Sequence, residues 1–388
     1  MRVMFHVQHL LGVGHIARAS RIALALHSAG AQVTVVSGGL PVPGFPPPGP
    51  DHLPLPAIAA GPQGFAGLVD RDGRPIDDAF REARRALLLD AFARIRPDVL
   101  LIEAWPFGRR QLRFELVPLI RAARARLRPP LIASSVRDIL QSGRKPGRDE
   151  ETVATLADFD AVLVHGDPGF ARLEDSFPLA GRIADRLHYT GLVAPPPVAV
   201  PPHPPRCDVL VSAGGGAVGA RLIETAVAAR DLLPPTLSWR ILTGPNLPED
   251  RFRALATRAA EAGPGAGGLV VERFHPDLAR LMAGARVSLS QAGYNTVCDL
   301  LRAGCAGILV PFASGGETEQ TLRAGLLARR GLARVLPEEG LAPALLARTI
   351  AEALAAGPPP PALPRPDLEG AARTARLLGD LLAARADA

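Results

Sequence analysis

The chain has 388 residues, 47% hydrophobic and 21% charged, a composition that excludes a disordered protein and suits two globular domains. The net charge is +6, but every basic residue except Lys145 is an arginine, and these are spread along the whole chain, which disfavours a nucleic-acid surface. No run of about 18 apolar residues occurs, and the apolar stretch after Met1 is too short for a signal peptide.

The three cysteines, Cys207, Cys298 and Cys305, form no C-x-x-C pair and no other pairing pattern. Neither a disulfide framework nor a zinc site is therefore indicated, and a reducing compartment is expected. We expect a cytoplasmic protein that is soluble, or at most peripheral at the inner face of the membrane.

The first half of the chain alternates short apolar runs with longer segments of helical period, which is typical of βαβ units and a parallel sheet. Strands are predicted near 3–7, 32–37, 98–103, 130–134, 160–164 and 187–190. Helices are predicted at 15–29, 76–94 and 112–127. The Pro- and Gly-rich segment 41–75 is predicted to be one long loop over the cleft. This pattern predicts an N-terminal Rossmann-like domain over 1–193.

A Gly-x-Gly-His motif, Gly12-Val13-Gly14-His15, stands between the first strand and the first helix. Its glycines let the backbone approach a ligand, and the helix N-terminus offers N–H groups to an anion. A dinucleotide fingerprint would need an acidic residue after the second strand, but 36–39 reads Val-Ser-Gly-Gly, which disfavours a nicotinamide or flavin cofactor. His15 is a candidate general base at the cleft, with helix capping as the equal alternative. With His6 and His9 it offers no regular ligand geometry, so no metal site is expected.

Polar residues end two further strands of this domain. Glu103 ends the strand at 98–103, while Arg137 and Asp138 follow the strand at 130–134. Because the carboxyl ends of parallel strands meet at one edge of a sheet, we expect these residues and Gly14 to lie on the acceptor side of the site. A structural role for each is equally open.

A basic segment over 109–128 carries seven arginines around apolar residues. Such an amphipathic helix is compatible with contact to an anionic membrane. In so arginine-rich a chain, a solvated helix face is the favoured interpretation.

Prolines recur between Pro195 and Pro205, and such a stretch sustains neither a helix nor a central strand. Residues 194–206 are therefore predicted to link two domains. Beyond them, strands are predicted near 208–211, 237–242, 269–272, 286–289, 306–310 and 332–335. They predict a second Rossmann-like domain over 207–360. A final predicted helix leaves residues 367–388 free to pack back on the N-terminal domain.

The first strand-to-helix junction of the second domain, 212–219, holds four glycines, among them Gly214, Gly215 and Gly216. Backbone amides of such a turn approach a diphosphate without obstruction by Cβ atoms, and the following helix dipole complements its charge. No Lys-Ser/Thr pair follows, so the junction is not a Walker A loop.

The junction at 290–299 follows another predicted strand. Asn295 and Thr296 are predicted to cap the next helix, and Gly293 permits the approach of a ligand. The Asp299 carboxylate can accept both hydroxyls of a ribose, with an ordinary solvated aspartate as the alternative.

The junction at 310–320 offers Glu319 and Gln320 as partners for sugar hydroxyls. Acidic residues in a first turn also simply favour the helix dipole, which accounts for Glu317. Since open α/β sheets bind ligands at the carboxyl ends of their strands, the junctions predict one shared crevice.

Six motifs in order along the chain resemble GT-B glycosyltransferases, and most of all the family 28 branch with the lipid-linked N-acetylglucosamine transferase of peptidoglycan synthesis. They are Gly12-x-Gly14-His15, Tyr189-Thr190-Gly191, the Gly-rich loop 212–219, Phe274-His275-x-Asp277-Leu278, Gln291 through Thr296, and Pro311-Phe312 through Gln320. The resemblance implies an α/β fold of GT-B architecture, in which two Rossmann-like parallel-sheet domains face each other across a cleft. It also implies a metal-independent, inverting hexosyltransferase that needs no cofactor and uses a nucleotide-sugar, a UDP-sugar in the first place, as donor.

The resemblance also implies a role for each matching position. The diphosphate would lie at Gly214–Gly216, the base at Phe274, the ribose at Asp299 and the donor sugar at Glu319 and Gln320, with Gly293, Asn295 and Thr296 lining the same pocket. The N-terminal domain would bind a hydroxyl acceptor, which can be lipid-linked, with His15 near the reacting centre.

Two departures from the family pattern leave the donor base and the acceptor open. Asp299 stands where the peptidoglycan enzymes commonly have a longer glutamate, and the motif ending in His15 is leaner than their Gly-rich loop. The lean motif also resembles the nucleotide-sugar hydrolase of pseudaminic acid synthesis. A hydrolase or epimerase that uses the same donor pocket therefore stays the alternative.

Overall fold

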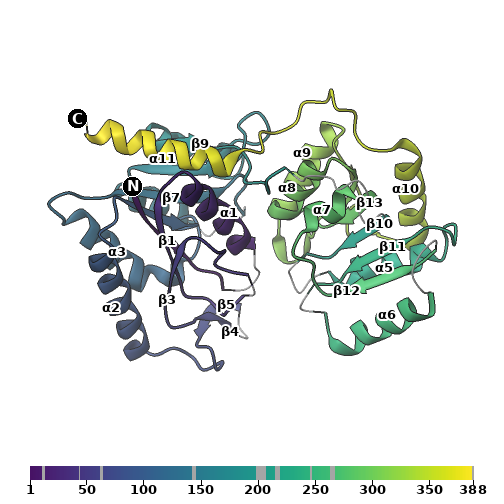
Figure 1. Ribbon diagram of the computed structural model, residues 1–388, viewed down its shortest axis with the longest axis horizontal. Coiled ribbons are helices and arrows are strands. Elements are labelled where there is room, and N and C mark those ends of the chain that lie inside the picture. Colours follow the sequence, from purple (N-terminus) through teal and green to yellow (C-terminus); the bar gives the residue numbers. More distant parts are fainter. Residues whose placement is uncertain are drawn as a thin grey trace. The chain divides into compact units, whose positions relative to one another are not determined.

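The computed structural model describes residues 1–10, 14–42, 44–61, 64–141, 146–197, 207–214, 219–244, 247–262 and 267–386. The chain divides into two compact units, which Figure 1 shows in the colours of the sequence. Unit 1 comprises Met1–Val193 and Asp367–Ala388, and unit 2 comprises Ala194–Pro366. The C-terminal helix therefore belongs to the same unit as the N-terminus.

Unit 1 is built on a parallel sheet of seven strands in the order β3-β2-β1-β6-β7-β8-β9. The strands are β1 (Arg2–Val7), β2 (Gln32–Ser37), β3 (Asp51–Pro54), β6 (Val99–Glu103), β7 (Leu131–Arg137), β8 (Ala161–His165) and β9 (Leu187–Tyr189). Its helices are α1 (Gly14–Ser28), α2 (Asp78–Ile95), α3 (Arg113–Arg124), α4 (Arg148–Leu156) and α11 (Gly370–Ala386).

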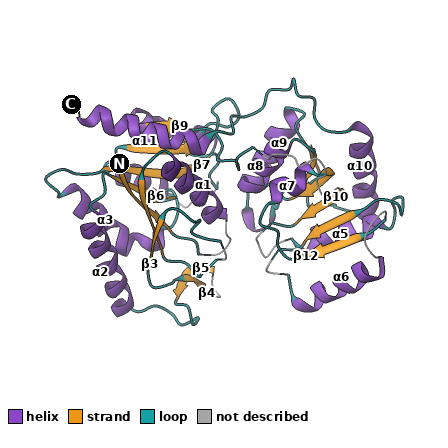
Figure 2. Ribbon diagram, in the orientation of Figure 1, coloured by secondary structure: helices purple, strands orange, loops and turns teal. Residues whose placement is uncertain are grey.

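Both faces of this sheet are buried, because alternate residues of each strand point to opposite sides. Val3 and Phe5 of β1 lie in a cluster with residues of α1 and α11, whereas Met4 lies in a second cluster with residues of α2 and α3. Figure 2 shows the strands of each unit as a layer with helices packed against it. Near-continuous apolar strands of this kind are typical of a parallel sheet covered on both sides.

The prediction of one long loop over 41–75 is wrong. This segment contains β3 at the edge of the sheet and a small antiparallel hairpin of β4 (Ala59–Gly61) and β5 (Gly64–Val69). An edge strand needs only one row of backbone hydrogen bonds, so Pro54 is tolerated at the end of β3. The Asp70 carboxylate closes the turn after β5 by accepting hydrogen bonds from the backbone N–H groups of Asp72 and Arg74, both at 2.9 Å.

The arginine-rich segment forms α3, which buries Leu116, Leu119 and Ile120 against the sheet. Ion pairs engage part of its basic surface, as the guanidinium of Arg113 contacts Glu151 and that of Arg124 lies 3.1 Å from Asp160. Within the described ranges, no helix combines the length and apolar character that crossing a membrane requires.

Unit 2 is a second parallel sheet, with six strands in the order β12-β11-β10-β13-β14-β15. They are β10 (Cys207–Ser212), β11 (Trp239–Leu242), β12 (Leu269–Glu272), β13 (Ala285–Ser290), β14 (Ala306–Leu309) and β15 (Arg334–Val335). The helices are α5 (Ala220–Arg230), α6 (Glu249–Ala262), α7 (Leu278–Ala283), α8 (Tyr294–Ala303), α9 (Glu319–Arg329) and α10 (Pro343–Ala356).

One hydrophobic cluster of unit 2 lies between the sheet and the helices α5 and α10. Val209 and Val287 of the central strands pack with Ile223 of α5 and Ile350 of α10. Two parallel sheets with covering helices confirm the predicted α/β class of doubly wound, Rossmann-like halves.

Candidate active site

The carboxyl edge of the unit 1 sheet gathers charged and polar side chains from neighbouring strands. Glu103 is the last residue of β6 and is paired in register with Ser135 of β7. Arg137, at the end of β7, is paired with His165 at the end of β8. His15 reaches the same edge from the first turn of α1, which begins at Gly14.

The Glu103 carboxylate is the centre of this edge and is 1% exposed. It lies 3.0 Å from His15 Nδ1, contacts the Arg18 guanidinium and accepts a 2.7 Å hydrogen bond from Ser135 Oγ. Burial alone would raise the pKa of Glu103, but the Arg18 cation together with His15 and Ser135 lowers it to about 2. The carboxylate is therefore ionised at neutral pH and can only accept hydrogen bonds.

The ionised carboxylate determines the tautomer of His15. Because Glu103 carries no proton, the 3.0 Å contact requires that His15 Nδ1 holds the N–H and donates it. Burial lowers the pKa of His15, and the Arg109 and Arg18 cations add to this against the opposing effect of Glu103. The neutral imidazole thus carries its lone pair on Nε2, on a side chain that stays 21% exposed. This is the arrangement of a general base with an orienting carboxylate.

A further arginine, Arg109, adds positive charge beside Glu103. Arg109 has a left-handed backbone (φ 61°) and its Nε donates to the carbonyl oxygen of Gln8 at 3.1 Å. Burial lowers the pKa of Arg109 to about 10, and the Arg137 and Arg18 cations contribute. Asp138 follows Arg137 and is fully buried, with Oδ1 accepting from the Ile139 N–H at 2.8 Å.

A buried ion pair supports the loops beside this edge. The fully buried Arg84 of α2 donates from Nε to Glu115 of α3 at 2.6 Å and from a terminal nitrogen to Gln8 Oε1 at 2.7 Å. It also donates to the carbonyl oxygens of Gly38 and Pro56. A Cβ atom at Gly38 would lie 2.2 Å from this guanidinium, so the glycine makes room for it.

Acid should destabilise unit 1 through His165, which is fully buried and whose pKa is lowered to about 3 by burial and by the Arg18 cation. The unfolded chain binds a proton at this residue near pH 6.5 and the native protein does not. The free energy of unfolding should therefore fall as the pH drops below 6.5, by up to about 1.4 kcal/mol per pH unit. Below about 4.5, Glu103 adds to the loss because its native pKa is lowered too.

Urea unfolding can measure this effect in unit 1 alone. Trp239→Phe leaves Trp105, which is 3% exposed in unit 1, as the one tryptophan of the chain. In that parent, His165→Gln should make the dependence shallower between pH 6 and pH 4.5. An unchanged slope would show that His165 takes up its proton equally in the folded and unfolded states.

Three helices of unit 2 begin at the carboxyl edge of its sheet without a hydrogen bond from the side chain of the N-cap residue. They are α5 after β10, α8 after β13 and α9 after β14, with Gly219, Gly293 and Thr318 at their N-cap positions. By contrast, the Asp277 side chain caps α7 by accepting from the Arg280 N–H at 3.0 Å. In α9 the Glu317 carboxylate instead accepts from the N–H of Glu319 at 3.0 Å. A first turn without such a partner presents N–H groups and a positive dipole to an anionic ligand.

The prediction that Asn295 and Thr296 cap α8 is wrong. The helix begins at Tyr294, so both residues lie within its first turn, and Gly293 takes the N-cap position in an extended conformation. A glycine has no side chain with which to cap the helix.

Close backbone packing shapes the loop after β10. Gly214 adopts φ 70°, and a Cβ atom at Gly244 would lie 2.5 Å from its carbonyl oxygen. A Cβ atom at Gly219 would lie 2.3 Å from that of Ala213, so α5 can start directly against the strand only with glycine there. Gly215 and Gly216, the other predicted diphosphate-binding residues, lie outside the described residues.

Gln320 joins two of the junctions. Its Oε1 accepts hydrogen bonds from the N–H of Ala292, after β13, at 3.0 Å and from that of Phe312, after β14, at 3.2 Å. The neighbouring Glu319 is 4% exposed and pairs with the fully buried Arg323 at 2.8 Å. Asp299 is likewise 6% exposed within α8. Glu319 and Gln320 thus carry framework contacts in addition to any contact with a ligand.

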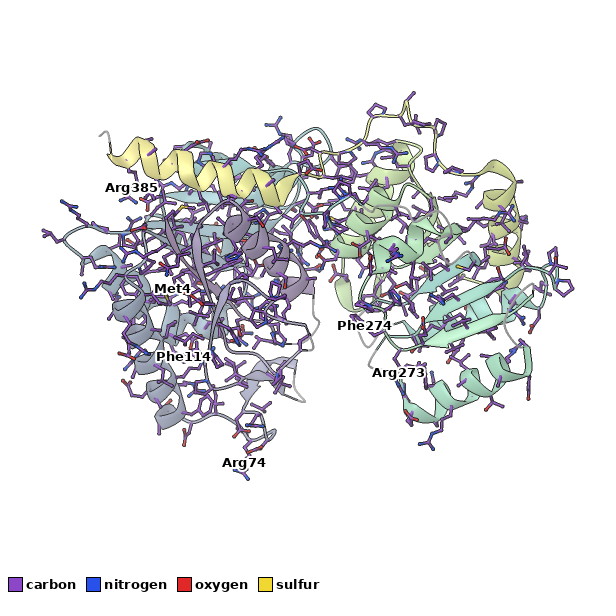
Figure 3. All side chains as sticks on the ribbon, in the orientation of Figure 1. Met4, Arg74, Phe114, Arg273, Phe274 and Arg385 are labelled. Carbon is purple, nitrogen blue, oxygen red and sulfur yellow. The ribbon has the colours of Figure 1, made fainter. Side chains whose placement is uncertain are left out.

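Phe274, predicted to hold the nucleotide base, is 65% exposed after β12 (Figure 3). The preceding Arg273 lies 4.2 Å from the ring centre of Phe252, donates to the carbonyl oxygen of Leu247 at 2.8 Å and pairs with Glu249. These contacts anchor the loop while the aromatic ring of Phe274 stays free to stack.

The sequence analysis did not identify Arg18 and His165 at the carboxyl edge of the unit 1 sheet, or Arg323 at that of the unit 2 sheet. His165 ends β8 as Glu103 ends β6, so the same strand-end argument applied to β8 would have found it. Arg18 lies one helical turn after His15, on the same face of α1. In the part of the chain that the structure describes, no three His, Cys, Asp or Glu residues lie close enough to hold a metal ion.

Most of unit 2 matches a domain found in known proteins. Residues 210–362 match the model of the glycosyltransferase family 28 C-terminal domain. A UDP-N-acetylglucosamine–N-acetylmuramyl-(pentapeptide) pyrophosphoryl-undecaprenol N-acetylglucosamine transferase of Methylorubrum extorquens is 32% identical over 212 residues, which are 52% of this chain and 55% of that protein. The transferase of the same name from Solidesulfovibrio magneticus is 33% identical over 38% of this chain and 41% of its own length. The chain thus matches at most about half the length of these relatives.

Solved structures extend the likeness of fold to the whole chain. The calicheamicin glycosyltransferase CalG4 matches with a TM-score of 0.59 and 18% identity over 100% of this chain and 96% of its own. The glycosyltransferase VinC in complex with dTDP gives 0.60 and 16% over 99% and 96%. MurG of Acinetobacter baumannii gives 0.54 and 16% over 99% and 98%. The predicted GT-B fold and the resemblance to family 28 are confirmed.

Proposed function

We propose that this chain, which carries a glycosyltransferase family 28 C-terminal domain within a GT-B fold, transfers a sugar from a nucleoside-diphosphate donor to a hydroxyl acceptor. The observation that carries the proposal is the His15–Glu103 pair, which presents a neutral imidazole with its lone pair on Nε2. Unit 2 would bind the donor and unit 1 the acceptor.

His15 Nε2 would take the proton of the acceptor hydroxyl as the oxygen attacks the anomeric carbon. Glu103 would hold the ring through Nδ1 and stabilise the imidazolium that forms. Direct attack opposite the leaving diphosphate inverts the anomeric configuration, so one displacement gives an inverted product. Gly14, Arg137 and Asp138 would line the acceptor side of this base.

The leaving group would be stabilised at the carboxyl edge of the unit 2 sheet. The loop of Gly214, Gly215 and Gly216 and the open first turn of α5 offer backbone N–H groups to the diphosphate. We propose that these dipoles, and not a metal ion, balance its charge as the bond breaks. Phe274 would stack on the base, Asp299 would accept from the ribose hydroxyls, and Glu319 and Gln320 would meet the sugar. Gly293, Asn295 and Thr296 would form the wall of that pocket.

The acceptor we propose to test first is a lipid-linked hydroxyl at a membrane surface, because the relatives are transferases named for an undecaprenol-linked acceptor. The alternative is a nucleotide-sugar hydrolase or epimerase, in which the same donor pocket turns over the donor with no acceptor present.

Asp299→Asn should weaken binding of the nucleoside diphosphate by roughly 10- to 100-fold, because a hydrogen bond to a charged acceptor contributes about 1.5–3 kcal/mol. Thermal shift against UDP-, GDP-, ADP- and dTDP-sugars first identifies the donor, since a ligand at 100 times its Kd stabilises by about 2.7 kcal/mol. Calorimetry then compares the variant with Asp250→Asn on the exposed face of α6. Equal affinity in both variants would remove Asp299 from the donor site.

A further inference from the structure

A chain of buried hydrogen bonds continues from Glu103 away from His15. Ser135 Oγ lies 2.7 Å from Glu103 Oε2 and 2.8 Å from His165 Nε2, and His165 Nδ1 lies 2.9 Å from Thr190 Oγ1. Ser135, His165 and Thr190 are all fully buried.

The direction of every bond in this chain is fixed. The single proton of the Ser135 hydroxyl must go to the ionised Glu103, so His165 Nε2 must donate to Ser135. The neutral His165 then accepts at Nδ1, and the Thr190 hydroxyl donates to it. Thr190 Oγ1 has longer contacts with the carbonyl oxygens of Val164 at 3.3 Å and Gly191 at 3.2 Å.

Thr190, at the far end of this hydrogen-bond chain, lies in a backbone segment that contacts the residues leading into α11. The N–H of Thr190 donates to the carbonyl oxygen of Val164 at 2.9 Å, and that of Leu192 donates to the carbonyl oxygen of Asp367 at 2.7 Å. A Cβ atom at Gly370 would lie 2.3 Å from the carbonyl oxygen of Gly191, so the two segments are in close contact. Thr190 therefore has a rigid support from which to fix His165.

We propose that His165 and Thr190 are positioning residues for the base, which fix Glu103 through Ser135 and so hold His15 with its N–H on Nδ1. The role of His15 in this proposal rests on the proposed function. The positioning roles of His165 and Thr190 rest on the hydrogen-bond chain. A buried polar network needs every member satisfied. Losing the His165 donor leaves the Ser135 oxygen without the bond that fixes its orientation, so the Ser135 hydroxyl holds the Glu103 carboxylate, and through it His15, less rigidly.

Two substitutions of His165 separate positioning from packing. The side-chain amide of Gln can donate to Ser135 from the position of Nε2, whereas Leu fills similar space and donates nothing. We expect His165→Leu to lower kcat roughly 10- to 100-fold with KM unchanged, by analogy with the loss found when the hydrogen-bond partners of metal-binding histidines are removed. His165→Gln should restore most of the rate. In a His15→Ala background, His165→Leu should lower the residual rate no further.

Side-chain ¹H–¹⁵N spectra of the histidines give a readout that needs no turnover. His15 should carry its proton on Nδ1 in the wild type and in His165→Gln, and should shift toward a mixture of tautomers in His165→Leu. Thr190→Val, which removes one hydroxyl, serves in its place if the Leu variant does not fold. An unchanged His15 tautomer in His165→Leu would overturn the proposal even if glycosyl transfer is established. Conversely, a failure to detect transfer would not change what the spectra show about His15. Equal losses of kcat in the Leu and Gln variants would also contradict it.

Discussion

His15→Ala should lower kcat by roughly 10²–10⁴-fold while the affinity for the donor stays the same, because the variant loses proton transfer and keeps unit 2 intact. The physical reason is the geometry at Glu103, whose ionised carboxylate leaves the Nε2 lone pair of His15 as the basic site. Steady-state rates with saturating donor and acceptor measure the loss, and calorimetry with the nucleoside diphosphate measures donor binding.

A matched control for this substitution lies on the same helix. His27 is an exposed histidine in the last turn of α1. His27→Ala therefore makes the same substitution in the same helix as His15→Ala, but away from the sheet edge. It should turn over at the wild-type rate. A His15→Ala enzyme as fast as the His27→Ala enzyme would remove His15 from the mechanism.

Glu115→Ala should cost about 3–5 kcal/mol of the free energy of unfolding of unit 1, because it leaves the buried Arg84 cation without its carboxylate. Both side chains are fully buried, and Arg84 also ties down the carbonyl oxygens of Gly38 and Pro56 beside the site. Urea unfolding followed by Trp105 fluorescence in the Trp239→Phe parent measures the loss.

An exposed ion pair on α2, the helix that carries Arg84, provides the control. Glu82 pairs with Arg85 one turn away, and the two side chains are 62% and 37% exposed, so Glu82→Ala should unfold at the urea concentration of the parent. If Glu115→Ala also unfolds with the parent, the energetic role assigned to the buried pair is wrong.

The sequence predicts the central strands well, because strands such as β1 and β14 are short apolar runs buried on both faces. The sequence does not predict β3, because this edge strand ends in a proline and lacks the apolar run of a central strand. The strand-end rule predicts that Glu103 and the α1 residue His15 share an edge, and the structure brings them into contact.

Partners far apart in the chain are harder to predict. Nothing in α2 marks Arg84 as buried, since its partner Glu115 is 31 residues away and becomes its neighbour only through the packing of α2 on α3. The start of α8 is also hard to predict. Asn295 is a favoured capping residue, but the helix begins at Tyr294, so Asn295 lies two residues past the N-cap position at Gly293 and does not cap the helix.

The most direct test of the proposed glycosyl transfer is a ¹H NMR time course of the identified nucleotide-sugar with the wild-type enzyme, recorded with and without a hydroxyl acceptor. We expect nucleoside diphosphate and a glycoside of inverted anomeric configuration to accumulate together, and only when acceptor is present. Release of free sugar at the same rate in both samples would contradict transfer and establish water as the acceptor.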